Sequence, residues 1–273
     1  MKVALFGLGE AGSLFGADLC AAGVRVTGFD PGSMPTPTGV VRCDDPVTAV
    51  AGAQVVLALT ASADACTALT QALTAIPADA IYADLSTSAA ALKRDLAATA
   101  AARCLPFADV ALMATVPGRG MRTPALAAGS GAAAYVAALA PLGVPVEVVS
   151  DEAGDAATRK LLRSVMMKGL AALVIEAMRA AEQAGLSEWL WGNLADEITA
   201  ADEALLARLV QGTGPHAVRR LHEMEACQAQ LESLGIDPVM TRSTVESLRR
   251  VPSEGIPALP LLGATTHSGS VRP

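Results

Sequence analysis

Short apolar runs alternate with segments of helix length over more than half of the chain. The runs predict strands near residues 3–7, 25–30, 54–60, 80–85, 106–112 and 145–149, and a weaker strand near 39–42. The segments between them predict helices near residues 11–22, 45–52, 62–75, 88–101 and 131–140. This alternation predicts an α/β fold with a doubly wound parallel sheet, whose ligands bind at the carboxyl ends of the strands.

From Gly154 the pattern becomes continuous helix. About thirty residues follow without a proline, and Gly185 is placed to end the helix. A helix of this length spans about 45 Å, enough to form the central rod of a second, all-α domain. Asp151 and Asp155 are the candidates to cap its start.

Three glycines follow the first apolar run in the motif GLGEAG. Gly7 permits a tight turn, Gly9 lets the backbone approach a pyrophosphate, and Gly12 lets the following helix pack closely on the sheet. The N–H groups that open this helix then face the phosphates. Strand, turn and helix together predict a Rossmann-type dinucleotide-binding domain with cofactor contacts from Gly7, Leu8, Gly9, Glu10, Ala11 and Gly12.

Asp30 ends the second apolar run, eighteen residues after Gly12. Its carboxylate is placed to accept hydrogen bonds from the adenosine ribose, where a 2′-phosphate would meet its negative charge. This favours NAD as the cofactor. NADP is the alternative, because Gly32, Ser33 and Thr36 follow and small hydroxyl residues can hold a phosphate.

Two further strand ends carry polar residues in apolar surroundings. The run QVVLALT leads into residues 60–62, and the run IYADLSTS covers residues 81–88. Ligands of such sheets sit at these ends. Cofactor contacts are therefore expected from Thr60, Ala61, Ser62 and Ser86, and a substrate contact from Thr87. For Ser62 and Ser88 the alternative is a helix N-cap and nothing more.

Composition narrows the function classes. A net charge of −7 without a basic stripe argues against nucleic acid as a partner. The five cysteines are scattered and lack CxxC spacing, so we expect reduced thiols and no metal site. The first strand leaves no room for a signal peptide, which predicts a cytoplasmic protein. Residues 161–178 contain Arg163, Lys168 and Glu176, which argues against a membrane span.

The long helix carries the residue that we expect to be catalytic. Two of the four lysines of the chain, Lys160 and Lys168, lie on it. Ser164 is about 40° and Lys168 about 80° around the helix from Lys160, so all three can face one cleft that holds the substrate. Nearby cations and desolvation would favour the neutral amine, which can accept a proton. On spacing alone, two lysines lying along the helix surface are an equal alternative.

Three motifs follow one another over the first two thirds of the chain: GLGEAGSLFGADLCAAG with Asp30, DLST at residues 84–87, and GDAATRK at residues 154–160. In this order they resemble the β-hydroxyacid dehydrogenases, which include 3-hydroxyisobutyrate and 6-phosphogluconate dehydrogenases. The resemblance implies hydride transfer between a nicotinamide cofactor and a small 3-hydroxy acid. It implies that Lys160 is the general acid/base and that Ser86, Thr87 and Ser164 orient the reacting oxygen.

Two motifs depart from the family pattern. The family's lysine is followed by two asparagines, which fall on Arg163 and Ser164. The family's Ser-Gly-Gly loop, which holds the substrate, falls on Met113, Ala114 and Thr115. The resemblance assigns these three residues to the substrate site, but the usual anchor for a small carboxylate is not reproduced. Arg119 and Arg122 are candidate replacements, with a solvated loop as the alternative.

The C-terminal third is similar to a less characterised branch of this superfamily that ends in a domain of unknown function. His216 and Arg220 lie four residues apart on one helix face and are candidates for substrate binding. A structural histidine and a surface salt bridge are the alternative. Trp189 and Trp191 are expected in the core or in a dimer interface.

The pattern and the resemblance together predict three parts of the chain. They are the dinucleotide-binding domain, a helical domain for substrate binding and dimerisation, and a poorly ordered tail, at residues 1–152, 153–260 and 261–273. The long apolar helices predict a homodimer joined through the second domain.

Two other function classes stay open. An imine reductase shares the fold and the cofactor but reduces a C=N bond and often lacks the lysine, so Lys160 argues against it. A non-catalytic dinucleotide sensor would leave Lys160 and Ser164 without a purpose.

Overall fold

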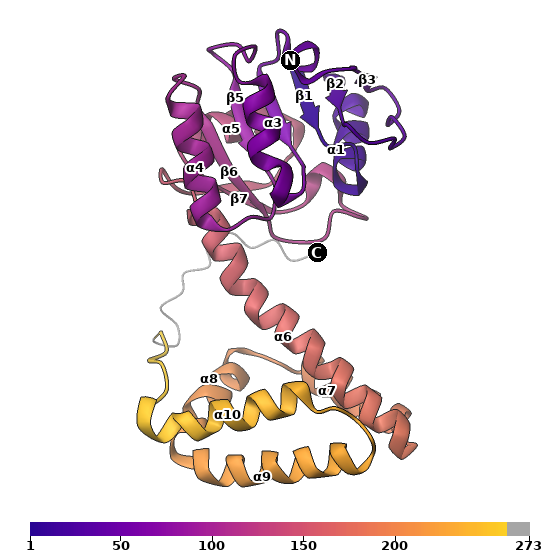
Figure 1. The fold of residues 1–273 in the computed structure, drawn as a ribbon, viewed down its shortest axis with the longest axis vertical. Helices are drawn as coiled ribbons and strands as arrows, with labels where there is room; N and C mark the ends of the chain where they lie inside the picture. The colour runs from indigo at the N-terminus through magenta and orange to yellow at the C-terminus, as the bar shows by residue number, and fades with distance from the viewer. Residues whose placement is uncertain (261–273) are drawn as a thin grey trace. The chain divides into compact units, whose positions relative to one another are not determined.

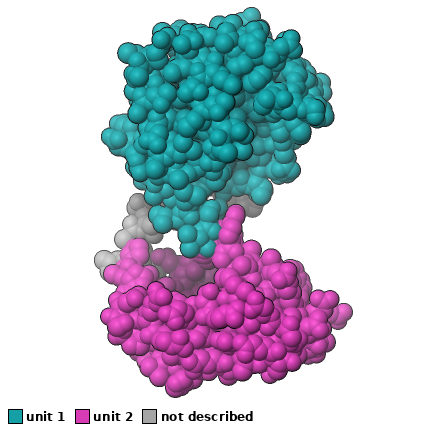
Figure 2. Space-filling model, viewed as in Figure 1, with its two compact units in different colours: residues 1–165 teal, residues 166–273 magenta. Residues whose placement is uncertain are grey.

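The computed structural model describes residues 1–260 and contains two compact units. The first comprises residues 1–165 and the second begins at residue 166 (Figure 2, teal and magenta). The predicted tail at 261–273 lies outside the described residues. We predicted the domain boundary at residue 152, before the long helix. The first unit instead ends at residue 165, which lies inside this helix.

The first unit is built on one eight-stranded sheet with the order β3-β2-β1-β4-β5-β6-β7-β8. All seven predicted strands are present. Strand β7 was not predicted, and it pairs antiparallel with β6, so the sheet is mostly rather than wholly parallel. The strands are β1 (Lys2–Phe6), β2 (Arg25–Phe29), β3 (Val41–Arg42), β4 (Val55–Ala58), β5 (Ile81–Asp84), β6 (Phe107–Leu112), β7 (Ala125–Ala128) and β8 (Val146–Ser150).

Helices cover both faces of this sheet (Figure 1). They are α1 (Glu10–Ala21), α2 (Pro46–Val50), α3 (Ala65–Ala72), α4 (Ala90–Ala101) and α5 (Ala132–Leu139), with short 3₁₀ turns η1 (Ser62–Asp64), η2 (Gly120–Arg122) and η3 (Ala140–Leu142). Successive side chains of β1 point to opposite faces of the sheet, and each face has its own hydrophobic core. Leu5 belongs to the core that contains Phe15 of α1, and Phe6 belongs to the core that contains Leu69 of α3. The predicted doubly wound architecture is confirmed.

The direction in which the chain crosses the sheet reverses between β1 and β4. Strands β2 and β3 continue on one side of β1, and β5 and β6 continue on the other side of β4. Such a reversal leaves a crevice at the carboxyl ends of the two central strands, where ligands of open α/β sheets bind.

The second unit is all-helical, as predicted. Helix α6 (Asp155–Ala184) enters it and ends before Gly185, whose φ of +70° fits the predicted glycine stop. Helices α7 (Ser187–Thr199), α8 (Glu203–Gln211), α9 (Thr213–Ser233) and α10 (Val239–Glu254) follow (Figure 1). Within residues 1–260 the helices are too short or too polar to cross a membrane.

A buried carboxylate joins two helices of this second unit. Glu176 of α6 accepts hydrogen bonds from the backbone N–H groups of Met240 and Thr241 at 2.7 and 2.9 Å, and from the Thr241 hydroxyl at 2.7 Å. It therefore caps the first turn of α10 from another helix. The two tryptophans of α7 are 64% and 59% exposed, so the expectation that Trp189 and Trp191 pack in the core of the chain is wrong.

Candidate functional site

The glycine turn after β1 is shaped by close backbone contacts. Gly7 has a φ of +86°, and a Cβ there would lie 2.5 Å from the carbonyl oxygen of Leu59. A Cβ at Gly12 would lie 1.9 Å from the carbonyl oxygen of Gly7. At Gly9, by contrast, a Cβ would meet no protein atom within 4 Å. Protein packing thus requires glycine at positions 7 and 12, whereas position 9 borders open space.

Asp30 holds this turn through both of its carboxylate oxygens. Oδ2 accepts a hydrogen bond from the Leu8 N–H at 2.7 Å, and Oδ1 accepts one from the Gly32 N–H at 2.7 Å. Two of the roughly four acceptor positions of the carboxylate are therefore used. The Arg42 guanidinium lies against the same segment and donates to the carbonyl of Asp30 at 2.8 Å. The sequence did not single out Arg42, because it lies twelve residues beyond Asp30 on an edge strand.

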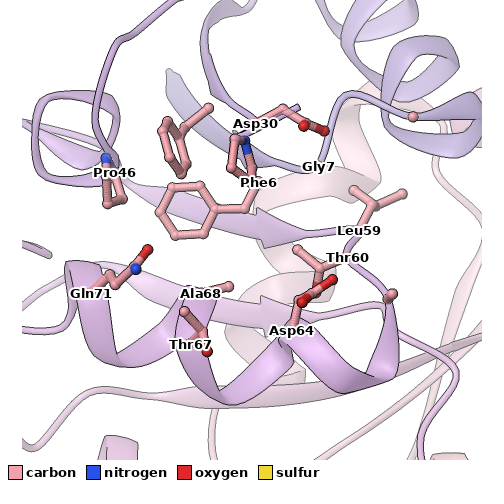
Figure 3. A pocket seen from close by; sticks show the side chains of 14 residues that line it. Phe6, Gly7, Asp30, Pro46, Leu59, Thr60, Asp64, Thr67, Ala68 and Gln71 are labelled. Atoms are coloured by element: carbon pink, nitrogen blue, oxygen red, sulfur yellow. The ribbon is translucent and has the colours of Figure 1, made fainter. Parts of the chain in front are cut away.

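A pocket of about 430 Å³ opens beside the turn, between the ends of β1 and β4. Phe6, Pro46 and Leu59 give it apolar walls, and Figure 3 shows Asp30 and Gly7 along one edge and the α3 side chains along the other. Predicted cofactor residues that line it are Gly7, Gly9, Asp30, Thr60 and Ala61. This is the crevice that the strand order predicts.

One wall of this pocket was missed by sequence reasoning. It comes from α3 and the turn before it, through Asp64, Thr67, Ala68 and Gln71 (Figure 3). These positions are spaced by three, four and seven residues, which is the period of one helix face. That period was the available signal, but none of the four residue types marks a binding site by itself.

Lys160 and Thr87 meet in a second, smaller pocket of about 270 Å³. The Lys160 Nζ donates a hydrogen bond to the Thr87 Oγ1 at 2.7 Å, although the two residues are 73 positions apart in the sequence. The predicted residues that line this pocket are Ala11, Thr60, Ser86, Thr87, Ala114 and Lys160, and its apolar walls are Leu59, Leu85, Leu112 and Val116.

The two pockets are neighbours because Leu59 and Thr60 line both of them. The Thr60 hydroxyl is also one of four buried side-chain polar atoms without a hydrogen-bond partner among the described residues. A buried hydroxyl of this kind is costly unless a ligand or water satisfies it. Thr60 therefore marks the junction at which a ligand could pass from one pocket to the other.

Three of the predicted substrate residues of this unit line neither pocket, and the predicted cofactor residues Leu8, Glu10, Gly12 and Ser62 do not line them either. Met113 contacts α6 through its backbone, because its carbonyl oxygen accepts a hydrogen bond from the Arg163 side chain at 3.0 Å. The Thr115 hydroxyl lies 3.5 Å from Arg119. Ser164 is half-buried one turn beyond Lys160.

The alternative interpretation of Ser62 and Ser88 as helix N-caps is wrong. Ser62 begins the turn η1 itself, after Ala61 as the cap residue. Helix α4 is preceded by Ala89, and Ser88 instead shares a 2.7 Å hydrogen bond with the Ser86 hydroxyl.

The predicted C-terminal substrate residues belong to the second unit. Lys168 and His216 are exposed there. Arg220 donates to the carbonyl of Leu209 at 3.3 Å and to the Thr213 hydroxyl, so it ties α9 to the end of α8. The neighbouring Arg219 forms a surface salt bridge with Glu223 at 3.5 Å. Within residues 1–260 no His, Cys, Asp and Glu side chains cluster in a way that could hold a metal ion.

The glycine turn, the acidic residue at the end of β2 and the pocket at the sheet reversal define a dinucleotide-binding protein of the Rossmann class. Residues 2–141 match the family model described as the NAD binding domain of 6-phosphogluconate dehydrogenase. The chain belongs to this family, which confirms the resemblance drawn from the motifs. Residues 181–251 match a second model, a domain of unknown function, DUF1932.

The chain is also similar to an uncharacterized protein and to a solved structure of a hypothetical protein. An uncharacterized 28.5 kDa protein of Methanothermus fervidus is 30% identical over 113 residues, and the match spans 41% of this chain and 45% of that protein. A conserved hypothetical protein from Sinorhizobium meliloti is 28% identical over 93% of this chain and 91% of that chain, with a TM-score of 0.59.

Two further solved structures share this fold. A conserved protein of unknown function, described as structurally similar to 3-hydroxyacid dehydrogenases, is 26% identical over 92% of this chain and 96% of that chain, with a TM-score of 0.59. An imine reductase from Myxococcus stipitatus in complex with NADP⁺ is 17% identical over 93% of this chain and 95% of that chain, with a TM-score of 0.76. At this identity the imine reductase shares the fold alone.

Proposed function

We propose that this protein is an NAD(P)-dependent oxidoreductase that transfers a hydride between nicotinamide and a small 3-hydroxy acid, with Lys160 as the general acid/base. The observation that carries the proposal is the 2.7 Å hydrogen bond from Lys160 Nζ to Thr87 Oγ1, in a pocket that shares Leu59 and Thr60 with the pocket beside the glycine turn. An amine in that position can exchange a proton with a hydroxyl that binds beside Thr87.

The residues of the larger pocket fit a nicotinamide dinucleotide. Open space at Gly9 and the unpartnered Thr60 hydroxyl support a ligand that follows the turn from one pocket to the other. When bound, the dinucleotide supplies or accepts the hydride. The backbone N–H groups of residues 9–12 at the start of α1 would hold its phosphates, because those of Gly7 and Leu8 already donate to Phe29 and Asp30. Asp30 would accept hydrogen bonds from the ribose with its remaining acceptor positions.

The residues of the smaller pocket would handle the proton and orient the substrate. In the direction of oxidation, Lys160 would take the proton of the substrate hydroxyl, and it would return this proton during reduction. Thr87 and Ser86 would fix the position of the reacting oxygen. The apolar side chains of Leu59, Leu85, Leu112 and Val116 would limit the access of water.

NAD is the cofactor that Asp30 favours, because its charge would repel a 2′-phosphate. Arg42 makes NADP the alternative, since its guanidinium lies against the backbone of residues 30–34. The complex of the Myxococcus stipitatus imine reductase with NADP⁺ also supports that alternative. Fluorescence titration with NADH and with NADPH separates the two. Tighter binding of NADH is expected, and tighter binding of NADPH would contradict the role of Asp30.

A second candidate function is imine reduction. The smaller pocket has mainly apolar walls, and Met113, Ala114 and Thr115 replace the loop that anchors a substrate carboxylate in the β-hydroxyacid dehydrogenases. Both features favour an uncharged substrate. Imine reduction, however, gives Lys160 no assigned role. For this reason we prefer the oxidation of a 3-hydroxy acid as the proposed function.

A substrate panel tests the proposal against this alternative. Purified protein is assayed for oxidation of 3-hydroxy acids of increasing size with NAD⁺ and NADP⁺, and for reduction of cyclic imines with NADH and NADPH. Turnover of a 3-hydroxy acid supports the proposal. Turnover restricted to imines would favour the second function, and cofactor binding without turnover of either class would favour the non-catalytic sensor.

A further inference from the structure

Three charged side chains are buried together behind the loop that carries Thr87. Asp84, Lys93 and Asp109 are each at most 1% exposed. The Lys93 Nζ lies 3.4 Å from Asp84 Oδ1 and 3.3 Å from Asp109 Oδ1, and it donates a 2.8 Å hydrogen bond to the carbonyl of Asp84. Removal of charges from water is costly even when they are paired. The chemistry proposed above uses none of these three groups.

The sheet itself brings the two carboxylates together. Asp84 of β5 and Asp109 of β6 are register partners on adjacent parallel strands. Like charges on neighbouring strands repel one another. Lys93 comes from the first turn of α4 and reaches both, so its ammonium group holds β5, β6 and α4 together.

The carboxylates also bond to the two segments that form the Lys160 site. Asp109 Oδ2 accepts hydrogen bonds from the N–H groups of Gly154 and Ala157, both at 3.0 Å, and therefore caps the first turn of α6. Asp84 Oδ1 accepts a 2.7 Å hydrogen bond from the N–H of Ser86, at the start of the loop to α4.

The distance from these anchors to the reacting groups is short. Lys160 follows Ala157 by three residues on α6, and Thr87 follows Ser86 directly. The first turn of α6 also has little freedom, because Gly154 has a φ of +98° and a Cβ there would lie 2.8 Å from the carbonyl oxygen of Ala90. A shift at Gly154 or Ala157 would therefore move Lys160 by a similar amount, since a helical turn is stiff.

We propose that Asp84, Lys93 and Asp109 form a positioning cluster that keeps Lys160 of α6 in register with Thr87 of the β5–α4 loop. The three residues touch neither pocket and act only through the backbone groups that they hold. The inference rests on the proposed function, in which Lys160 and Thr87 are the groups that must be aligned.

The test compares Asp109→Ala with Asp109→Asn. Both substitutions remove the charge beside Lys93, so they share most of the cost to folding. Only asparagine keeps an oxygen for the N–H groups of Gly154 and Ala157. This oxygen is expected to stay on the helix, because Lys93 keeps Asp84 as its partner.

The alanine variant is expected to have a kcat at least about tenfold below that of the asparagine variant, while the two bind NADH with Kd values within about twofold, because a misplaced acid/base group lowers turnover rather than cofactor affinity. Amide hydrogen exchange at residues 154–157 is expected to be faster in Asp109→Ala than in Asp109→Asn. The exchange measurement needs no substrate and no turnover.

Equal kcat values and equal exchange rates in the two variants would overturn the inference. If Asp109→Ala yields no folded protein, Asp109→Glu takes its place, because it keeps the charge for Lys93 and moves the acceptor by one methylene group. If Asp109→Glu has the kcat of the wild type and the wild-type rate of amide hydrogen exchange at residues 154–157, the proposed positioning role of the cluster is also contradicted. A failure of the proposed function can be distinguished from a failure of this inference. If the proposed function is wrong, Lys160→Ala keeps the turnover of the wild type, and the comparison of amide exchange between the Asp109 variants still tests the positioning cluster.

Discussion

At the scale of single residues, the glycines of the turn after β1 are required for different reasons. A Cβ at Gly12 would overlap the carbonyl oxygen of Gly7, whereas one at Gly9 would enter open space. The sequence motif assigns both to a dinucleotide site but does not separate them. The structure separates a glycine needed by the fold from one that only a ligand would require.

Substitution of each glycine by alanine tests this separation. Gly9→Ala is expected to unfold at the temperature of the wild type and to bind NADH at least about tenfold more weakly, a loss of about 1.4 kcal/mol. Gly12→Ala is expected to lower the melting temperature, because the turn and α1 must move apart. Thermal denaturation and fluorescence titration measure the two effects. Undiminished NADH binding by Gly9→Ala would contradict the placement of the phosphates at this turn.

Residues of the candidate site could be predicted from the sequence when they belong to a short sequence motif. Gly7, Asp30, Thr87 and Lys160 each stand in a short pattern with its own physical reason. The cap of α6 was not predictable in this way. The sequence pointed to Asp151 or Asp155, but Asp109 supplies the acceptor from a strand 45 residues before Gly154. No local pattern reveals a cap that arrives through the tertiary fold.

At the scale of elements, strand β7 shows why the sheet was predicted only in part. Its sequence ALAA lacks the β-branched and aromatic residues that are typical of strands. Only the short 3₁₀ turn η2 separates it from β6, and no α-helix does, since the antiparallel pairing needs no crossover. Most of the other strands were recognisable because helical segments separate them in the βαβ alternation, although β3 follows β2 without a helix.

Helix α10 depends on a carboxylate outside its own sequence, that of Glu176 on α6. Burial raises the pKa of Glu176, but the hydrogen bonds from Thr241 and Met240 outweigh it and hold the pKa below its usual value. A carboxylate with a depressed pKa stabilises the fold at pH values above its unfolded pKa. This contribution is lost as the pH falls through the lower folded value.

Glu176→Ala is expected to lower the free energy of unfolding by about 2 kcal/mol at neutral pH, because the capped N–H groups lose a charged acceptor. Glu176→Gln is the matched control, since it keeps an oxygen acceptor but does not ionise. The stability difference between wild type and Glu176→Gln is expected to shrink as the pH falls below 4.5, the usual pKa of glutamate. Chemical denaturation at a series of pH values measures it, and a difference that stays constant would contradict the ionised cap.

At the scale of the whole molecule, the second unit leaves many large apolar side chains in contact with solvent. The exposed fractions are 53% for Ile175, 64% for Trp189, 59% for Trp191, 52% for Leu209 and 58% for Val218. Its buried residues, by contrast, include small ones such as Ala180, Ala181, Ala207 and Ala217. Extensive exposed apolar surface is typical of an interaction site. We propose that a second copy of this chain covers it in a homodimer.

Light scattering on the purified protein tests the dimer. A mass of twice the 27.6 kDa of the chain is expected. Trp191→Glu is expected to shift the protein toward the monomer, because a charge would enter the apolar interface. The control Asn193→Glu adds the same charge at a nearby exposed polar position and is expected to stay dimeric. A monomeric wild type at micromolar concentration would contradict the proposal.

The turnover of Lys160→Ala tests whether Lys160 is the general acid/base. We expect a kcat at least about a hundredfold below that of the wild type, with a Kd for NADH within about twofold, because the lysine handles the proton and not the dinucleotide. Arg159→Ala removes an exposed cation from the adjacent position of α6 and is expected to retain wild-type turnover. A Lys160→Ala enzyme that turns over a 3-hydroxy acid at the wild-type rate would contradict the role of Lys160 as the general acid/base.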